Sequence, residues 1–237
     1  LTVSKTSKLS IEKFSGRKKE ILYLYNSVNR EFIKESNEIA YSELLKKDFT
    51  SRALNLDLPN IIYIATLTPR KCHLDLLEAL SKTKNLLNVN LVGYPTSKKI
   101  RKLIESKRTI NGSIIRSNIN YFPKLSQKDL CTLLLYSSAY VSTSENEGFG
   151  IPVLEAALYE IPLIIRDIDI NRELFLNSKF FQSNDQLSKL LDNINPLTKI
   201  EIEKRKESLS KINEEKLMKK FNYSTLSNKL KNILESN

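Results

Sequence analysis

The chain has 237 residues, of which 41% are hydrophobic and 27% charged, and it carries a formal net charge of +11. This length and composition fit a globular protein of one full domain with appendages, or of two small domains, and they exclude an overall disordered chain. No run approaches the roughly 18 apolar residues of a membrane-spanning helix. The first residues lack the layout of a signal peptide, so we expect a cytoplasmic protein.

The lysines that give the positive charge are scattered and do not gather with arginines and aromatic residues. This distribution argues against nucleic acid as a partner. A basic face that holds the protein at the anionic inner surface of a membrane stays open as an alternative. Cys72 and Cys131 have neither metal-ligand spacing nor the density of a disulfide scaffold, which fits a reducing compartment.

The first part of the chain differs from the rest. Residues 1–4 and 21–25 have the pattern of strands, residues 5–14 that of a helix, and residues 34–58 form a polar stretch. We interpret residues 1–30 as the end of one domain and the start of a linker, and residues 31–60 as the linker. Because the chain begins with Leu1, we also expect a preceding segment to be missing.

The middle of the chain alternates short apolar runs with helical patterns. Five strands are expected at 61–65, 89–92, 119–122, 139–142 and 162–165, followed by helices at about 73–84, 96–107, 126–136, from near Pro152, and at 171–177. This alternation predicts an α/β fold, a Rossmann-like parallel sheet flanked by helices, over residues 61–197. From residue 198 to 237 the pattern becomes helical and charged, which predicts a C-terminal helical tail.

A parallel sheet of this kind has its ligand crevice at the carboxyl ends of the strands. The loops after Ala65, Val92, Phe122, Ser142 and Ile165 should therefore carry the chemistry. Two of these loops have suggestive residues, namely the basic residues that follow Ala65 and the glycines that follow Ser142.

Only five glycines occur in the chain, and Gly148 and Gly150 lie in the loop after the strand at 139–142. Glycine lets a backbone approach a ligand closely, and Pro152 is preset for the first turn of a helix. The amides at such a helix N-terminus suit an anionic diphosphate. Glu147 and Glu155 flank the glycines, and either carboxylate can accept sugar or ribose hydroxyls. Taken singly, each residue also fits a tight turn, a core position or a helix-dipole contact.

Residues 144–156 resemble the E-x7-E signature of the retaining family-4 glycosyltransferases, which have the two-domain GT-B fold. Residues 66–71, Thr-Leu-Thr-Pro-Arg-Lys, look like the basic loop with which that family holds the donor diphosphate. Residues 1–4, 24–28 and 221–223 resemble three further family segments, with Ser27 and Glu160 at positions where glycine is usual. The resemblance covers nearly the whole chain and implies the carboxyl-terminal, donor-binding half.

The resemblance implies transfer of a hexosyl residue from a GDP- or UDP-linked sugar to a glycan or lipid-linked acceptor, without a metal or other cofactor. It implies catalytic roles for Glu147, Lys71 and Arg70, and donor contacts for Thr66, Glu147, Gly148, Phe149, Gly150, Ile151 and Glu155. It further implies that the chain is inactive without an amino-terminal acceptor domain, which a separate chain could supply.

Three alternatives stay open. Asp167-Ile168-Asp169 could be the metal-binding D-x-D of a GT-A glycosyltransferase, although two aspartates after a strand more often form a turn or cap. The chain could instead be a non-catalytic or degenerate nucleotide-sugar-binding module, or one subunit of a split transferase. His73, the only histidine, is interpreted as a cap or a solvent-facing residue, and Glu173 as an acid on a helix surface.

Overall fold

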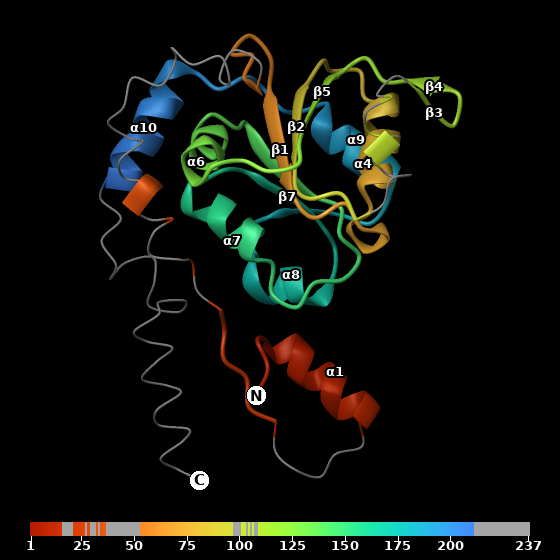
Figure 1. Ribbon diagram of the computed structural model, residues 1–237, viewed down its shortest axis with the longest axis vertical. Helices are drawn as coiled ribbons and strands as arrows, with labels where there is room; N and C mark the ends of the chain where they lie inside the picture. Colours follow the sequence, from red (N-terminus) through yellow and green to blue (C-terminus); the bar gives the residue numbers. More distant parts are fainter. Residues whose placement is uncertain are drawn as a thin grey trace.

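The computed structural model contains a parallel α/β sheet with helices on both faces (Figure 1). It describes residues 1–15, 21–26, 28, 32, 34–36, 53–96, 101, 102, 104, 106 and 109–210. Six strands build the main sheet: β1 (Asn60–Ile64), β2 (Asn88–Val92), β5 (Asn118–Phe122), β6 (Ala139–Ser142), β7 (Leu163–Arg166) and β8 (Lys179–Phe181).

The helices alternate with these strands. They are α1 (Lys5–Ser15), α4 (His73–Lys82), α6 (Gln127–Leu135), α7 (Ile151–Leu158), α8 (Asp169–Leu174), α9 (Asn184–Leu191) and α10 (Lys199–Ser210), with a 3-10 turn η2 at Pro69–Lys71. Side-chain caps begin four of them: Ser4 accepts from the Ser7 amide in α1, Ser126 from the Asp129 amide in α6, Ser183 from the Gln186 amide in α9 and Thr198 from the Glu201 amide in α10. Among the described residues, no helix combines the length and apolar character needed to cross a bilayer.

The strand order is β5-β2-β1-β6-β7-β8, and every pairing within this sheet is parallel. From β1 the chain proceeds outward through β2 to β5, then returns to β6 on the other side of β1. The order therefore reverses between β1 and β6. In open parallel sheets, the carboxyl ends of the two strands at such a reversal flank the ligand crevice.

Alternate side chains of each central strand enter two separate cores. Ile61 and Tyr63 of β1 pack with α4 and α9, whereas Ile62 packs with α6 and α7. Figure 1 shows α4 and α9 on one side of the sheet and α6, α7 and α10 on the other. Because both faces are covered, β2 is buried along its whole length, as expected for a central parallel strand.

The amino-terminal segment lies beyond the carboxyl edge of the sheet, where α8 separates α1 from the strands (Figure 1). The strands predicted at 1–4 and 21–25 are reduced to a single parallel bridge between Thr2 and Tyr23. Helix α1 confirms the helix predicted at 5–14. The prediction that residues 1–30 and 31–60 are a domain end and a linker stays a prediction.

All five predicted strands of the sheet are present, and the fold class is confirmed. Sequence patterns missed β8, helix α9 and the small antiparallel hairpin of β3 (Thr109–Ile110) and β4 (Ser113–Ile114). The predicted helix at 96–107 falls largely outside the described residues, although Arg101, Lys102, Ile104 and Ser106 are helical. Helix α10 begins the predicted helical tail, whereas Ser27 and residues 211–237 lie outside the described part of the chain.

Candidate functional site

The loops after β1 and β6 are fastened to each other at the reversal of the sheet. The Thr143 hydroxyl lies 3.0 Å from the Lys71 carbonyl oxygen and 2.8 Å from that of Cys72, and donates to this turn. The Tyr63 hydroxyl donates to the same Lys71 oxygen over 2.6 Å, and the Glu145 amide donates to the Arg70 oxygen over 3.2 Å. The two loops therefore form one unit at the carboxyl edge of the sheet.

Arg166, at the end of β7, is bound to this unit by a hydrogen bond and an ion pair. Its Nε donates to the Thr143 carbonyl oxygen over 2.8 Å, and its Nη2 forms an ion pair with the Asp75 carboxylate of α4. The guanidinium also lies 5.4 Å from the centroid of the Phe181 ring. Sequence reasoning missed Tyr63, Thr143 and Arg166, because no motif marks residues that act by holding two loops together.

Three charged side chains from the joined loops meet on the outer side of this unit. Lys71 Nζ forms an ion pair with Glu147 Oε1, and Arg70 Nη1 lies 3.6 Å from Glu147 Oε2. Arg70 Nη1 also donates to the Asn146 carbonyl oxygen. The side chains of Lys71 and Glu147 are each 13% exposed, whereas that of Arg70 is 51% exposed. The structure thus brings together the residues for which sequence predicted catalytic roles.

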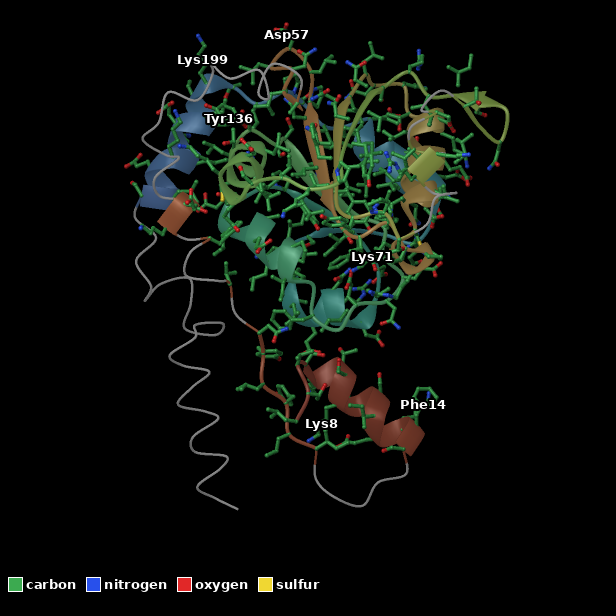
Figure 2. All side chains as sticks on the ribbon, viewed as in Figure 1. Lys8, Phe14, Asp57, Lys71, Tyr136 and Lys199 are labelled. Atoms are coloured by element: carbon green, nitrogen blue, oxygen red, sulfur yellow. The ribbon has the colours of Figure 1, made fainter. Side chains whose placement is uncertain are left out.

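Figure 2 locates this cluster by the label of Lys71, which lies at the edge of the sheet nearest α8. Asp57, just before β1, lies at the opposite edge. The charged cluster is therefore at the carboxyl end of β1, where the βα topology requires a ligand site to be.

The glycine loop leads directly from this cluster into α7. Gly150 caps the helix with φ 87° and ψ 51°, a left-handed conformation that glycine adopts without the Cβ strain of other residues. Pro152 occupies the first turn, as predicted. The amides of Gly148, Gly150 and Ile151 donate no hydrogen bond to another described residue. Unbonded amides at a helix N-terminus favour an anion.

The Phe149 ring lies inside the protein. It is 3% exposed and packs against Tyr25 with a centroid separation of 6.0 Å. The side chain therefore belongs to the core, and a donor contact of Phe149 would fall to its backbone. Thr66 is exposed just after β1, and among the described residues its side chain forms no hydrogen bond with Arg70, Lys71 or Glu147.

Glu155 lies in the second turn of α7 and is partly buried. Its carboxylate has no hydrogen bond or ion pair with any other described residue, and burial raises its pKa to about 7. Both Glu147 and Glu155 contribute, after burial, to the raised pKa of the Tyr140 hydroxyl. Both carboxylates are therefore close enough to Tyr140 of β6 to act on its hydroxyl, and Glu155 has no polar partner among the described residues that a ligand would have to displace.

The first aspartate of the D-x-D triplet already has two hydrogen-bond partners. Asp167 receives Arg172 Nη2 at 2.6 Å and Gln182 Nε2 at 2.8 Å, and the Arg172 bonds hold its pKa below the usual range. Asp169 is the first residue of α8. Cys72, Asp75 and Glu145 form the one cluster of three potential metal ligands that the described residues contain. Asp75 is already paired with Arg166 there.

Two interpretations of single residues were wrong. His73 does not face solvent: it is 2% exposed and stacks on Tyr63, with ring centroids 4.7 Å apart. Burial, and then the charge of Lys71, lower its pKa to about 4. Glu173 is not a simple surface acid, because its carboxylate accepts the amides of Lys5 and Thr6 at 2.9 and 2.7 Å and so caps α1.

Comparison with known proteins decides the family. Residues 46–216, more than half of the chain, match the family model described as glycosyl transferases group 1. The chain belongs to the group 1 glycosyl transferases. The paired cations, the acidic signature and the glycine loop all lie within the matched region.

This chain also matches curated proteins that are much longer than it is. It is 29% identical over 133 residues to a protein named serotype-specific mannosyltransferase WbdA from Escherichia coli, which covers 54% of this chain and 16% of that protein. The chain thus spans about a sixth of the length of the curated relatives it matches.

Solved structures share the fold of this group 1 chain. HepE from Anabaena, crystallised with UDP and glucose, aligns with a TM-score of 0.70 and 16% identity over 100% of this chain and 62% of HepE. Sucrose-phosphate synthase from Thermosynechococcus elongatus aligns with a TM-score of 0.70 and 14% identity over 99% of this chain and 57% of that enzyme. The parallel sheet matches one Rossmann-like half of the GT-B fold.

Proposed function

We propose that this chain is the nucleotide-sugar-binding half of a retaining, family-4 glycosyltransferase. One observation carries the proposal: Arg70 and Lys71, after β1, meet Glu147 and the glycine loop, after β6, at the reversal of the sheet. Cations, unbonded amides and a carboxylate in one crevice suit the two chemical parts of a nucleotide sugar, its diphosphate and its hydroxyls.

The site has the groups that such a transfer needs. Negative charge builds on the departing diphosphate as the sugar passes through an oxocarbenium-like transition state. Lys71, Arg70 and the amides of the glycine loop would stabilise that charge, because donors already in place need no reorganisation during the reaction. Glu147 would orient the hydroxyls of the donor sugar. No step in this scheme requires a metal.

Glu155 supports a nucleotide as the second part of the ligand. A partly buried carboxylate with no polar partner among the described residues would gain, in its ionised form, from accepting two vicinal hydroxyls, such as those of a ribose. The nucleobase would then lie on the far side of Glu155 from the diphosphate. The N-terminus of α7 would then face the phosphates, and its second turn would face the sugar of the nucleoside.

The relatives narrow the substrate class. One is named a mannosyltransferase, and HepE was crystallised with UDP and glucose. We therefore propose a GDP- or UDP-linked hexose as donor and a glycan or lipid-linked molecule as acceptor. An acceptor domain, in the same polypeptide or a separate chain, would complete the cleft. The net charge of +11 would favour contact with an anionic membrane at the cytoplasmic face.

Donor binding can be tested on the 237-residue chain itself. Calorimetry with GDP-mannose and UDP-glucose should detect one of them, and Lys71→Ala should weaken that binding roughly ten- to a hundredfold, the range expected for a charge-assisted hydrogen bond. Lys84→Ala, which removes an exposed lysine that follows α4, is the matched control.

Equal affinities of the wild type and Lys71→Ala would remove Lys71 from the site. Absence of binding to either nucleotide sugar would instead favour a degenerate remnant. Donor binding with no transfer, even when an acceptor domain is supplied, would favour a non-catalytic module.

A further inference from the structure

One acidic residue of the site pairs with both of its cations. Both cations that would hold the diphosphate point at Glu147, since Lys71 Nζ contacts Oε1 and Arg70 Nη1 lies 3.6 Å from Oε2. The Lys71 and Glu147 side chains are largely shielded from water. A shielded pair is screened by salt much less than an exposed one, so the contact is more than a surface ion pair.

The loop that carries Glu147 cannot easily move away from the cations. The Glu145 amide and the Ser144 hydroxyl both donate to the Arg70 carbonyl oxygen, at 3.2 and 3.4 Å, and Thr143 binds the following residues of the same turn. The backbone thus fixes Glu147 opposite Arg70 and Lys71. A diphosphate that reaches these cations must lie beside the Glu147 carboxylate.

The fixed Glu147 carboxylate disfavours the binding of a bare diphosphate more than the binding of a nucleotide sugar. Both ligands place negative oxygens near the fixed carboxylate and are repelled by it. The nucleotide sugar also offers hydroxyl donors, which Glu147 can accept in exchange for its contact with Lys71. A free nucleoside diphosphate has no such hydroxyls next to its phosphates, and its terminal phosphate carries additional charge.

We propose that Glu147 is an internal counter-ion that lowers the affinity of the site for free nucleoside diphosphate relative to nucleotide sugar. The residue would then set the specificity of the site for substrate over product and speed the release of the spent diphosphate. This inference rests on the proposed donor site and adds to it a competition between the Glu147 carboxylate and the phosphates.

A neighbouring acid provides a matched control. Glu145 lies in the same loop, is exposed, and has no ion pair with Arg70 or Lys71 among the described residues. Its carboxylate lies instead within 4.8 Å of the Cys72 and Asp75 ligand atoms. Glu145→Gln and Glu147→Gln therefore remove the same charge from the same loop, but only the second removes the carboxylate that pairs with the two cations.

The test measures the affinities of the wild type and both variants for three ligands by calorimetry: inorganic pyrophosphate, the nucleoside diphosphate and the matching nucleotide sugar. Glu147→Gln should bind pyrophosphate and the nucleoside diphosphate about tenfold more tightly, because its cations are no longer paired. It should bind the nucleotide sugar no more tightly than the wild type. Glu145→Gln should change each affinity by less than about twofold.

The counter-ion role is overturned if the wild type binds the diphosphate and Glu147→Gln binds it no more tightly. It is also overturned if Glu145→Gln gains the same affinity as Glu147→Gln. Either result leaves the donor site standing. If neither pyrophosphate nor any nucleotide binds to the wild type or the variants, the proposed function itself fails. Thermal unfolding of each variant checks that it folds, and Glu147→Ala, for which the same tightening is expected, provides a second test should Glu147→Gln unfold.

Discussion

Burial shifts the pKa of both Glu155 and His73, but the two residues have different roles. Both are ionisable side chains whose charged form is disfavoured by burial. His73 lies in the core against Tyr63 and stays neutral near neutral pH, so it contributes packing. Glu155 lies beside the glycine loop with a pKa of about 7, so a ligand can shift its ionisation. The position of each residue, and not the size of its pKa shift, therefore distinguishes the structural role of His73 from the proposed ligand-binding role of Glu155.

The raised pKa of Glu155 predicts a pH-dependent affinity for the donor. The ionised carboxylate accepts ribose hydroxyls better than the neutral acid, so affinity for the nucleotide sugar should rise as the pH increases through about 7. Calorimetry from about pH 6 to about pH 8 measures this rise; a nucleotide sugar suits the experiment because its diphosphate has no terminal phosphate that titrates there. Glu155→Gln should give a flat profile, and a wild-type profile as flat as that of the variant would contradict the assignment.

The same shift has a consequence for the stability of the ligand-free protein. Because the folded pKa lies above the unfolded value of 4.5, the folded state binds the Glu155 proton more tightly. This contribution to stability is complete below about pH 4.5 and is lost as the pH rises towards 7. Bound donor should reverse the loss by favouring the ionised form.

At the level of single residues, the sequence predicted that certain charged residues meet, but it did not predict how deeply other side chains are buried. The cluster of Arg70, Lys71 and Glu147 followed from motifs and from strand ends, which topology brings together. The burial of His73 could not be predicted, because it depends on the left-handed turn at Cys72 that directs the following residue under the loop. No sequence pattern around Cys72 and His73 signals such a left-handed turn.

Among the elements, the turn that ends α7 contains a strained residue. Glu160 has φ 53°, a left-handed conformation that costs most residues about 1–2 kcal/mol and that glycine adopts freely. Its carboxylate accepts the Ser208 hydroxyl of α10 at 2.7 Å. The side chain thus links α7 to α10 in exchange for backbone strain, which gives the departure from glycine a structural role.

Glu160→Gly tests this balance. Relief of the strain should outweigh the added freedom of the unfolded chain and the loss of one exposed hydrogen bond, so the free energy of unfolding should increase by up to about 1 kcal/mol. Urea denaturation measures the change, and Ser208→Ala, which removes the hydrogen bond alone, should cost less than about 0.5 kcal/mol. A decrease of more than about 1 kcal/mol in Glu160→Gly would show that the link to α10 outweighs the strain.

The elements missed in the sequence had weaker or overlooked signals. Strand β8 has three residues, too few for a pattern of alternation. The hairpin of β3 and β4 turns at Asn111 and Gly112, both with positive φ, and an Asn-Gly pair is a hairpin signal that sequence analysis could have used. Helix α9 is likewise preceded by Ser183, a recognisable N-terminal cap.

Over the whole molecule, the fold places the candidate site where two cores and two loops converge. The sheet reverses between β1 and β6, and helices cover both faces, so the carboxyl edge near Lys71 carries the loops of both strands (Figure 2). The sequence predicted a parallel sheet but not the order of its strands, because the choice of neighbouring strands depends on packing between distant segments. The association of α1 with α8 through Glu173 was equally hidden from sequence.

The amino-terminal segment also contacts the site. The Val3 side chain lies 3.7 Å from where a Cβ on Gly148 would be, and Tyr25 packs on Phe149. The loop that would hold the diphosphate is therefore supported on its outer side by residues far away in the chain. This support makes the glycine loop part of the folded body rather than a free loop.

The central claim is that the nucleotide sugar binds between the loops after β1 and β6. Amide hydrogen exchange of the full chain, with and without whichever nucleotide sugar binds in calorimetry, tests it most directly. Exchange should become slower on binding at Arg70, Lys71 and residues 148–151, with little change at residues 55–60 on the opposite edge of the sheet. Binding with no protection at residues 148–151 would contradict it.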